Sequence, residues 1–302
     1  MAESRVAVYG AIAANVAIAV TKFIVAGISG SAAMLSEAIH STVDTVNDVL
    51  LLVGMARSQR PPTEEHPFGH GKELYFWSLI VGVLIFGVGG GISFYEGVLH
   101  VRNPPRTTDP FWNYVVLAAA AVFEGASFVL GWRQFARERG STPFWRALRT
   151  SKDPTTFTVV AEDAVALAGL AIAAVGVFAS DKLGIAQLDG VASMLIGLLL
   201  AGVAVLLIRE SRGLLVGEGI KPETAKAIRE MLMNEPGVHD VGPILSMYIG
   251  PEEALVAVEV RFASDMDAGA AGNAIRSARE HIRERFPNLK RIYIDVPEEA
   301  PK

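Results

Sequence analysis

Six long apolar runs fill the first two thirds of the sequence and restrict the chain to a membrane architecture. A helix that crosses a bilayer needs about 20 mainly apolar residues, because it rises only about 1.5 Å per residue. Runs of this length lie at residues 6–28, 33–55, 74–99, 111–135, 155–179 and 188–208. The connecting segments contain Gly and Pro, which end helices. We therefore expect an α-helical membrane protein with six transmembrane helices.

The positions of the basic residues predict how these helices are oriented. If the N-terminus is cytoplasmic, the cytoplasmic segments contain 12 Lys and Arg residues, whereas the opposite loops contain only Arg102, Arg106 and Lys182. Because short cytoplasmic loops are enriched in Lys and Arg, both termini are expected in the cytoplasm. The first run leads directly into a second one and is too long for a signal peptide, so we expect it to be retained. Residues 1–212 would then form the transmembrane domain.

Residues 213–302 have the pattern of a small soluble domain. We expect amphipathic helices at residues 222–234 and 267–286, and strands at residues 241–249, 255–262 and 291–296. The order helix–strand–strand–helix–strand predicts a cytoplasmic α+β domain of ferredoxin-like type. A domain of this size has a small core, which favours pairing with a second copy and predicts a homodimer.

The composition excludes several classes of function. The 302 residues include no Cys, so disulfides, thiolate metal sites, Cys nucleophiles and iron–sulfur clusters are ruled out together. The net charge of −5 gives no support to nucleic-acid binding, which requires a basic face.

Ionisable residues inside the second and fifth apolar runs point to a function. A charged side chain at the centre of a bilayer costs about 2.5–3.5 kcal/mol on insertion scales, so such residues are rarely kept without a role. The second run contains Glu37, His40, Asp44 and Asp48, and the last three lie on one face of a helix. This polar stripe is the first half of a candidate binding site.

The fifth run supplies the second half, because Glu162 and Asp163 interrupt an otherwise apolar sequence. Neither run has a Lys or Arg near these acids, and Lys22 in the first run is the one basic candidate at similar depth. A divalent cation or protons would offset the repulsion between the carboxylates. One imidazole nitrogen and two or three carboxylate oxygens suit tetrahedral zinc, although iron, cobalt and manganese remain compatible. Asp48 can alternatively form a hydrogen bond within the helix bundle, and Glu162 or Asp163 alone can be the ligand.

A second group of candidate ligands follows the second run. Residues 63–72 read Thr-Glu-Glu-His-Pro-Phe-Gly-His-Gly-Lys, and they place His66 and His70 four residues apart with Glu65 just upstream. This spacing is compatible with a second cation site at the cytoplasmic rim. A solvated turn with incidental histidines is the alternative.

The motif His40-Ser-Thr-Val-Asp44, followed by His66-Pro-Phe-Gly-His70-Gly-Lys72, resembles the cation diffusion facilitator family of divalent metal cation/proton antiporters. The resemblance covers nearly the whole chain, including six spans and a C-terminal ferredoxin-like domain. The family's transport site combines two residues four apart on the second helix with two residues four apart on the fifth. The resemblance implies that His40 and Asp44 are the first pair and that Asp163 is the last residue of the second pair.

The remaining position of the family's second pair is occupied by Val159, where His or Asp is usual. Glu162 is then expected to replace the missing ligand, and the carbonyl of Asn47 to assist. Such a site is richer in oxygen than the family's usual one, which raises the case for manganese, iron or cobalt beside zinc. The resemblance also implies a loop site at His66 and His70, with Glu65 or its neighbour Glu64. The C-terminal domain lacks the two histidines expected for regulatory metal, so we expect weak binding or none there.

The resemblance implies a transporter and no enzyme. It would export cytoplasmic Zn²⁺ (or Mn²⁺, Fe²⁺ or Co²⁺) in exchange for protons by alternating access, without an organic cofactor, as a homodimer in the plasma or inner membrane. Two other readings remain open, namely a non-transporting membrane metal sensor or scaffold and an intramembrane metallohydrolase. The sequence contains no HExxH motif that would support the hydrolase.

Overall fold

The computed structural model describes residues 2–104, 110–139 and 154–297 of the chain, with side chains described from residue 15 onward except at 134, 137–139 and 154–161. Two compact units are present. The first consists of Met1–Met55 and Phe76–Ser211, and the second of Ala56–Tyr75 and Arg212–Lys302. The second unit therefore includes the segment that joins the second helix to the third.

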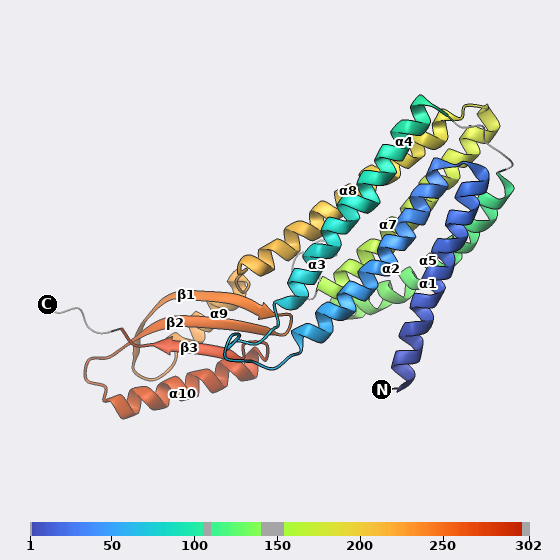
Figure 1. Cartoon of the computed structure of the whole chain (residues 1–302). Helices are drawn as coiled ribbons and strands as arrows, with labels where there is room; N and C mark the ends of the chain where they lie inside the picture. The colour runs from blue at the N-terminus through green and yellow to red at the C-terminus, as the bar shows by residue number, and fades with distance from the viewer. Residues whose placement is uncertain (1, 105–109, 140–153, 298–302) are drawn as a thin grey trace. The chain divides into compact units, whose positions relative to one another are not determined.

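The first unit is a bundle of long helices (Figure 1). They are α1 (Ala2–Ser29), α2 (Ala32–Ser58), α3 (Glu73–Leu84), α4 (Ser93–Arg102), α5 (Phe111–Arg139), α7 (Pro154–Leu183) and α8 (Gln187–Val216). A π-helical turn at Ile85–Ile92 joins α3 to α4, so that residues 73–102 form one continuous helix. Each predicted apolar run lies within a helix, because long apolar segments without Pro satisfy their backbone hydrogen bonds internally.

Four helices of the described residues are long and apolar enough to cross a membrane, and they cover residues 73–102, 111–133, 162–183 and 187–216. The described side chains of α1 form a shorter apolar stretch, Asn15–Ser29. The polar residues of α2 lower its mean hydropathy, which removes it from this group although its length is sufficient. The transmembrane helical domain is thus evident, and the crossing by six helices remains a prediction.

Glycines allow the α3–α4 helix to pack directly on α8. A Cβ atom at Gly97 would lie 2.6 Å from the backbone oxygen of Gly190, and a Cβ atom at Gly90 would lie 3.0 Å from that of Gly197. Real Cβ atoms do not approach backbone so closely, so the contact requires glycine on both helices.

The start of α2 is fixed by a side chain from α8. Gly30 ends α1 with a φ of +68°, and the chain turns directly into α2. The Asp189 carboxylate accepts hydrogen bonds from the Ser31 hydroxyl at 2.6 Å and from the backbone N–H of Ala32. A carboxylate at this position satisfies the free N–H groups of the first helical turn and favours the helix dipole.

The second unit contains a three-stranded sheet and two helices. The elements are α9 (Pro222–Met233), β1 (Val238–Gly250), β2 (Glu253–Phe262), α10 (Ala268–Arg285) and β3 (Arg291–Asp295). The strand order is β1-β2-β3, with β1 and β2 antiparallel and β2 and β3 parallel. This is the predicted helix–strand–strand–helix–strand order, and the α+β class is confirmed. Side chains of α9 and α10, including Leu232 and Ile282, form a core with alternate residues of the strands such as Val256 and Ile292.

Candidate functional site

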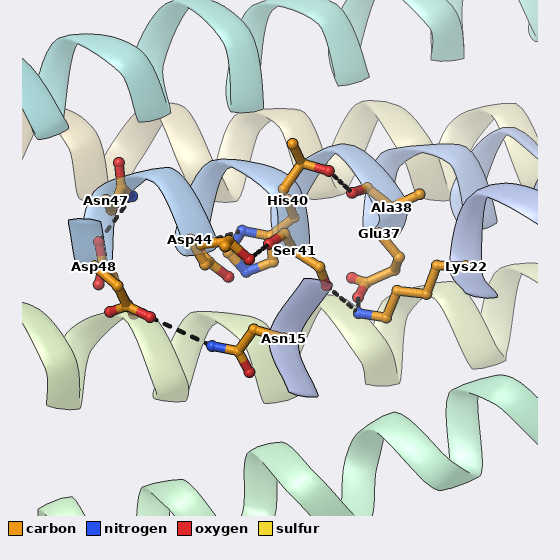
Figure 2. A network of polar contacts seen from close by, with 12 residues as sticks. Asn15, Lys22, Glu37, Ala38, His40, Ser41, Asp44, Asn47 and Asp48 are labelled. Atoms are coloured by element: carbon orange, nitrogen blue, oxygen red, sulfur yellow. Dashed lines mark hydrogen bonds and ion pairs between the residues drawn. The ribbon is translucent and has the colours of Figure 1, made fainter. Parts of the chain in front are cut away.

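His40 and Asp44 lie side by side on α2, as the i, i+4 spacing predicts (Figure 2). The Nδ1 atom of His40 is 3.3 Å from Oδ1 of Asp44. The His40 side chain is only 3% exposed, and within the described residues neither of its ring nitrogens forms a hydrogen bond. Buried polar atoms normally have hydrogen-bond partners, so a buried imidazole with both nitrogens available is a strong candidate ligand.

Asn47 connects this stripe to α7. Its Nδ2 group donates a hydrogen bond of 3.1 Å to Oε1 of Glu162, and both residues are buried. The Oδ1 atom of Asn47, which the sequence offers as an auxiliary ligand, has no hydrogen-bond partner in the described part of the chain. Asp48 accepts a hydrogen bond of 3.3 Å from Asn15 of α1. The alternative role of Asp48, a hydrogen bond within the bundle, is therefore realised.

Asp163 faces α5. Its Oδ2 atom accepts a hydrogen bond of 2.9 Å from the hydroxyl of Ser127. Val159 lies one turn earlier in α7, and its side chain is outside the described residues. The adjacent acids Glu162 and Asp163 thus bind different helices, because successive residues of a helix differ in direction by about 100°.

One cavity brings these residues together. Its volume is about 340 Å³ and residues from α1, α2, α5 and α7 form its wall. The lining residues are Asn15, Ile18, Ser41, Asp44, Asp48, Phe123, Glu124, Ser127, Glu162 and Asp163. His40 contacts the cavity through its neighbour Asp44. Five of these residues carry carboxyl groups, so the cavity forms an acidic chamber that suits cations.

The cavity does not hold a compact ligand cluster. Within the described residues, no three His, Asp or Glu side chains are grouped closely enough to hold a metal ion. Amide and hydroxyl groups bind three of the acids, since Asn15 donates to Asp48, Asn47 to Glu162 and Ser127 to Asp163. Of the transport ligands expected from the sequence, Asp44, Glu162 and Asp163 line the cavity, and neutral groups bind the last two.

Lys22 provides a positive charge next to this chamber (Figure 2). Its Nζ atom donates a hydrogen bond of 3.0 Å to Oε2 of Glu37 and one of 2.7 Å to the hydroxyl of Ser41. The one basic candidate at depth thus neutralises Glu37, the member of the α2 acids that does not line the cavity. Asp44 and Glu162 have no such ion pair with Lys or Arg among the described residues.

The helix α5 contributes residues to the cavity that are not among the ligands expected from the sequence. Glu124 and Ser127 line the cavity from this helix. The available signal was a carboxylate at mid-helix without a basic residue nearby in the sequence. Nothing in the sequence alone shows that this carboxylate points to the same chamber as Asp44.

The loop histidines belong to the second unit. The rings of His66 and His70 have their centroids 4.6 Å apart, and Nδ1 of His70 is buried without a hydrogen-bond partner in the described residues. Glu65 is exposed. The same loop is bound to the C-terminal end of α8, because Nζ of Lys72 donates to the backbone oxygen of Leu215 at 3.2 Å. The guanidinium of Arg291 also lies over the ring of Phe68, 5.2 Å from its centroid.

Several known proteins are similar to this chain over most of its length. Residues 8–216 match the family model described as the cation efflux transmembrane domain. The proton-coupled zinc antiporter SLC30A9, mitochondrial, of Homo sapiens is 35% identical over 244 residues, which are 80% of this chain and 43% of that protein. Metal tolerance protein C4 of Arabidopsis thaliana is 33% identical and aligns with 87% of this chain and 58% of its own length. The manganese efflux system protein MneP of Bacillus subtilis is 24% identical and aligns with 95% of this chain and 93% of its own length.

The chain spans less than half the length of the SLC30A9 proteins that it matches. Among solved structures, the nickel form of a MamM CTD variant is 11% identical and covers 26% of this chain and 100% of that chain, with a TM-score of 0.25.

Proposed function

Since the chain belongs to the cation efflux family, whose model matches residues 8–216, we propose that it exports divalent metal cations from the cytoplasm in exchange for protons. Zn²⁺ and Mn²⁺ are the proposed substrates, with Fe²⁺ and Co²⁺ as further candidates. The relatives support this choice, because they are named as a proton-coupled zinc antiporter and a manganese efflux protein.

The observation that carries the proposal is the acidic cavity lined by α2 and α7 together with the buried imidazole of His40, whose nitrogens form no hydrogen bond within the described residues. We propose that His40 and Asp44 bind the cation from α2, and that Glu162 and Asp163 bind it from α7. Asn47 and Asp48 are auxiliary residues. One nitrogen and several oxygens form a ligand set that suits zinc and leaves room for manganese.

Protons exchange with the cation at the same atoms. Metal ligands must be deprotonated to bind, so metal and proton compete for imidazole and carboxylate groups. The imidazole nitrogen of His40 can bind either a proton or a metal ion, which makes this residue suited to the exchange. In the proposed cycle the metal binds from the cytoplasm, the helices rock to open the cavity outward, and protons displace the metal.

The proposed topology has six transmembrane helices in residues 1–212, with both termini in the cytoplasm and residues 213–302 as a cytoplasmic dimerisation domain. It is supported by the excess of Lys and Arg in the segments assigned to the cytoplasmic side, 12 against three. We propose the cell membrane as the location, a choice supported by the alignment of a bacterial efflux protein with 95% of the chain.

We further propose that His66 and His70 bind a second cation with Glu65. The support is the 4.6 Å separation of the two ring centroids and the buried, unpartnered Nδ1 atom of His70. For the homodimer, the support is an apolar surface on the sheet, where Leu245, Met247 and Tyr293 are 68%, 38% and 48% exposed. Apolar patches on a soluble domain commonly mark association surfaces.

A flux measurement in proteoliposomes tests the function. The purified chain should move Zn²⁺ or Mn²⁺ in a saturable manner, and a proton gradient directed oppositely should accelerate it. Asp44→Ala should reduce the flux to the level of protein-free liposomes, because Asp44 lines the cavity next to His40. Glu210→Gln is the matched control, since Glu210 lies on α8 outside the cavity wall and its loss should leave the flux unchanged. Equal flux by Asp44→Ala and the unmodified chain would refute the proposal.

A further inference from the structure

Glu124 is a carboxylate in the middle of an apolar helix. It lies 13 residues after the start of α5 at Phe111, and its neighbours in the sequence are Phe123 and Gly125. No hydrogen bond or ion pair engages this carboxylate within the described residues, and its side chain is half-buried. An unpaired acid inside a membrane-spanning helix raises the free energy of the folded protein. A role in binding therefore explains Glu124 better than a role in packing.

The face of α5 that carries Glu124 points toward the proposed transport ligands. Glu124 and Ser127 are three residues apart, so they share one helix face, and both line the cavity. The Ser127 hydroxyl donates to Asp163 of α7 at 2.9 Å, which fixes the direction of this face. The Glu124 carboxylate therefore opens into the same chamber as Asp44.

The chamber is larger than a bare metal ion requires. At about 30 Å³ per water molecule, its 340 Å³ can hold a cation that keeps part of its hydration shell. In such a space the Glu124 carboxylate can bind the ion directly or through a retained water. His40, which lies next to Asp44, supplies an imidazole nitrogen.

We propose, resting on the proposed transport function, that Glu124 is a further cation-binding residue of the chamber and shifts its selectivity from Zn²⁺ toward Mn²⁺. The reason is ligand chemistry. Imidazole suits zinc, whereas carboxylate and water oxygens suit manganese, so an added carboxylate favours the ion that depends on oxygen. The departure at Val159, which removes a potential imidazole from α7, acts in the same direction.

Glu124→Gln and Glu124→Asp separate binding from packing. In proteoliposomes, Glu124→Gln should lower kcat/KM for Mn²⁺ about 10-fold or more and change the value for Zn²⁺ less than about 3-fold, in line with the effect of residues around metal ligands. Glu124→Asp keeps the charge and should retain most of the Mn²⁺ flux. Glu210→Gln again serves as the control for the loss of a glutamate charge. Mn²⁺ binding to the detergent-purified chain, followed by electron paramagnetic resonance, should weaken in the same order.

Three outcomes would overturn the inference. Equal Mn²⁺ and Zn²⁺ flux in Glu124→Gln and the unmodified chain would remove Glu124 from the site while the proposed transport function stands. An equal loss of both metals in Glu124→Gln and Glu124→Asp would assign Glu124 a structural role. Absence of flux and of saturable metal binding in the unmodified chain would overturn the transport function and this inference together. If Glu124→Gln does not fold, Glu124→Ala takes its place: a ratio of Mn²⁺ flux to Zn²⁺ flux below that of the unmodified chain supports the inference, and an unchanged ratio overturns it.

Discussion

The ammonium group of Lys22 lies 3.0 Å from Oε2 of Glu37, and the two side chains are 1% and 0% exposed. This buried ion pair joins α1 to α2 next to the acidic chamber, because Ser41, whose hydroxyl accepts a hydrogen bond from Lys22, lines the chamber wall. On α7, Gly169 leaves room for the carboxylate, since a Cβ atom there would lie 2.6 Å from Oε1 of Glu37. The pair thus sets how α1, α2 and α7 meet.

Lys22→Met should destabilise the protein strongly. It leaves the buried Glu37 carboxylate without its countercharge, and breaking a buried pair in this way costs about 3–5 kcal/mol. The double variant Lys22→Met/Glu37→Gln should recover much of the loss, because no isolated charge remains. Thermal unfolding in detergent measures both. A Tm for Lys22→Met equal to that of the unmodified chain would contradict the prediction.

Glu162→Gln should reduce zinc and manganese flux about 10-fold or more if Glu162 replaces the ligand that Val159 lacks. Adding Val159→Asp to this variant should restore part of the flux, because position 159 is one helical turn before Asp163. The measurement is the initial rate of uptake into proteoliposomes. If Glu162→Gln transports normally, Asp163 is the sole ligand from α7.

Gly71→Ala should weaken the packing of the loop that contains His66 and His70 against the sheet domain. A Cβ atom at Gly71 would lie 2.9 Å from the Cα of Gly250 and closer still to the backbone oxygen of Ile249, so the two backbones would have to separate. Hydrogen exchange of residues 61–72 should increase and the Tm should fall. Gly272→Ala is the control, since nothing lies within 4 Å of its Cβ position in α10, and it should stabilise the helix by about 0.5–1 kcal/mol. Equal exchange in both variants would disprove the predicted docking.

Leu245→Glu should dissociate the proposed homodimer. Leu245 is 68% exposed on the apolar surface of the sheet, and a charge there would be buried without a partner if two copies met through this surface. Light scattering of the purified chain should show a dimer before the substitution and a monomer after it. Lys226→Gln, on the exposed face of α9, should leave the dimer intact. A dimer that persists in Leu245→Glu would place the interface elsewhere.

The sheet domain should be slightly more stable at mildly acidic than at alkaline pH because of His281. Its Nδ1 atom is 2.8 Å from Oε1 of Glu235, and the hydrogen bond to Glu235 raises the pKa of His281, with the charges of Glu235, Glu284 and Glu280 acting in the same direction. A raised pKa means that the folded state favours the protonated ring. This stabilisation is fully present below the ordinary pKa of about 6.5 and is lost as the pH rises through the raised value.

The effect should be small, because the His281 ring is 57% exposed and solvent screens the pair. Comparing the Tm of the full chain with that of His281→Asn between pH 5 and 9 tests it. The difference between the two should shrink as the pH rises. A difference that grows with pH would show that the sign is wrong.

Local signals explain what could be predicted from the sequence. The helix α10 occupies Ala268–Arg285, where residues 267–286 were expected, because its apolar period and its N-cap Asp267 are both written in the local sequence. The pairing of His40 with Asp44 follows equally from helical spacing. The α+β domain is predicted by the same reasoning. Its apolar residues recur with the helical period in the helices and at alternate positions in the strands.

Contacts between distant segments could not be predicted in this way. Three such features depend on how helices and loops pack in three dimensions. They are the bond from Lys22 to Glu37, the position of Glu124 on the chamber wall, and the approach of Gly71 to Gly250. A single sequence shows which residues share one face of a helix. It does not show toward which neighbouring helix that face is turned. Asp48 shows the limit clearly, because it shares the His40 stripe and yet binds Asn15 of α1.

The glycine contacts between the α3–α4 helix and α8 have a mechanical consequence. Where Gly97 meets Gly190, the two backbones are in close contact, which leaves little room for the helices to slide past each other. These two helices are therefore suited to act as a stiff frame. The deformation that exposes the chamber to alternate sides of the membrane would then fall on α1, α2, α5 and α7, the helices that form its wall.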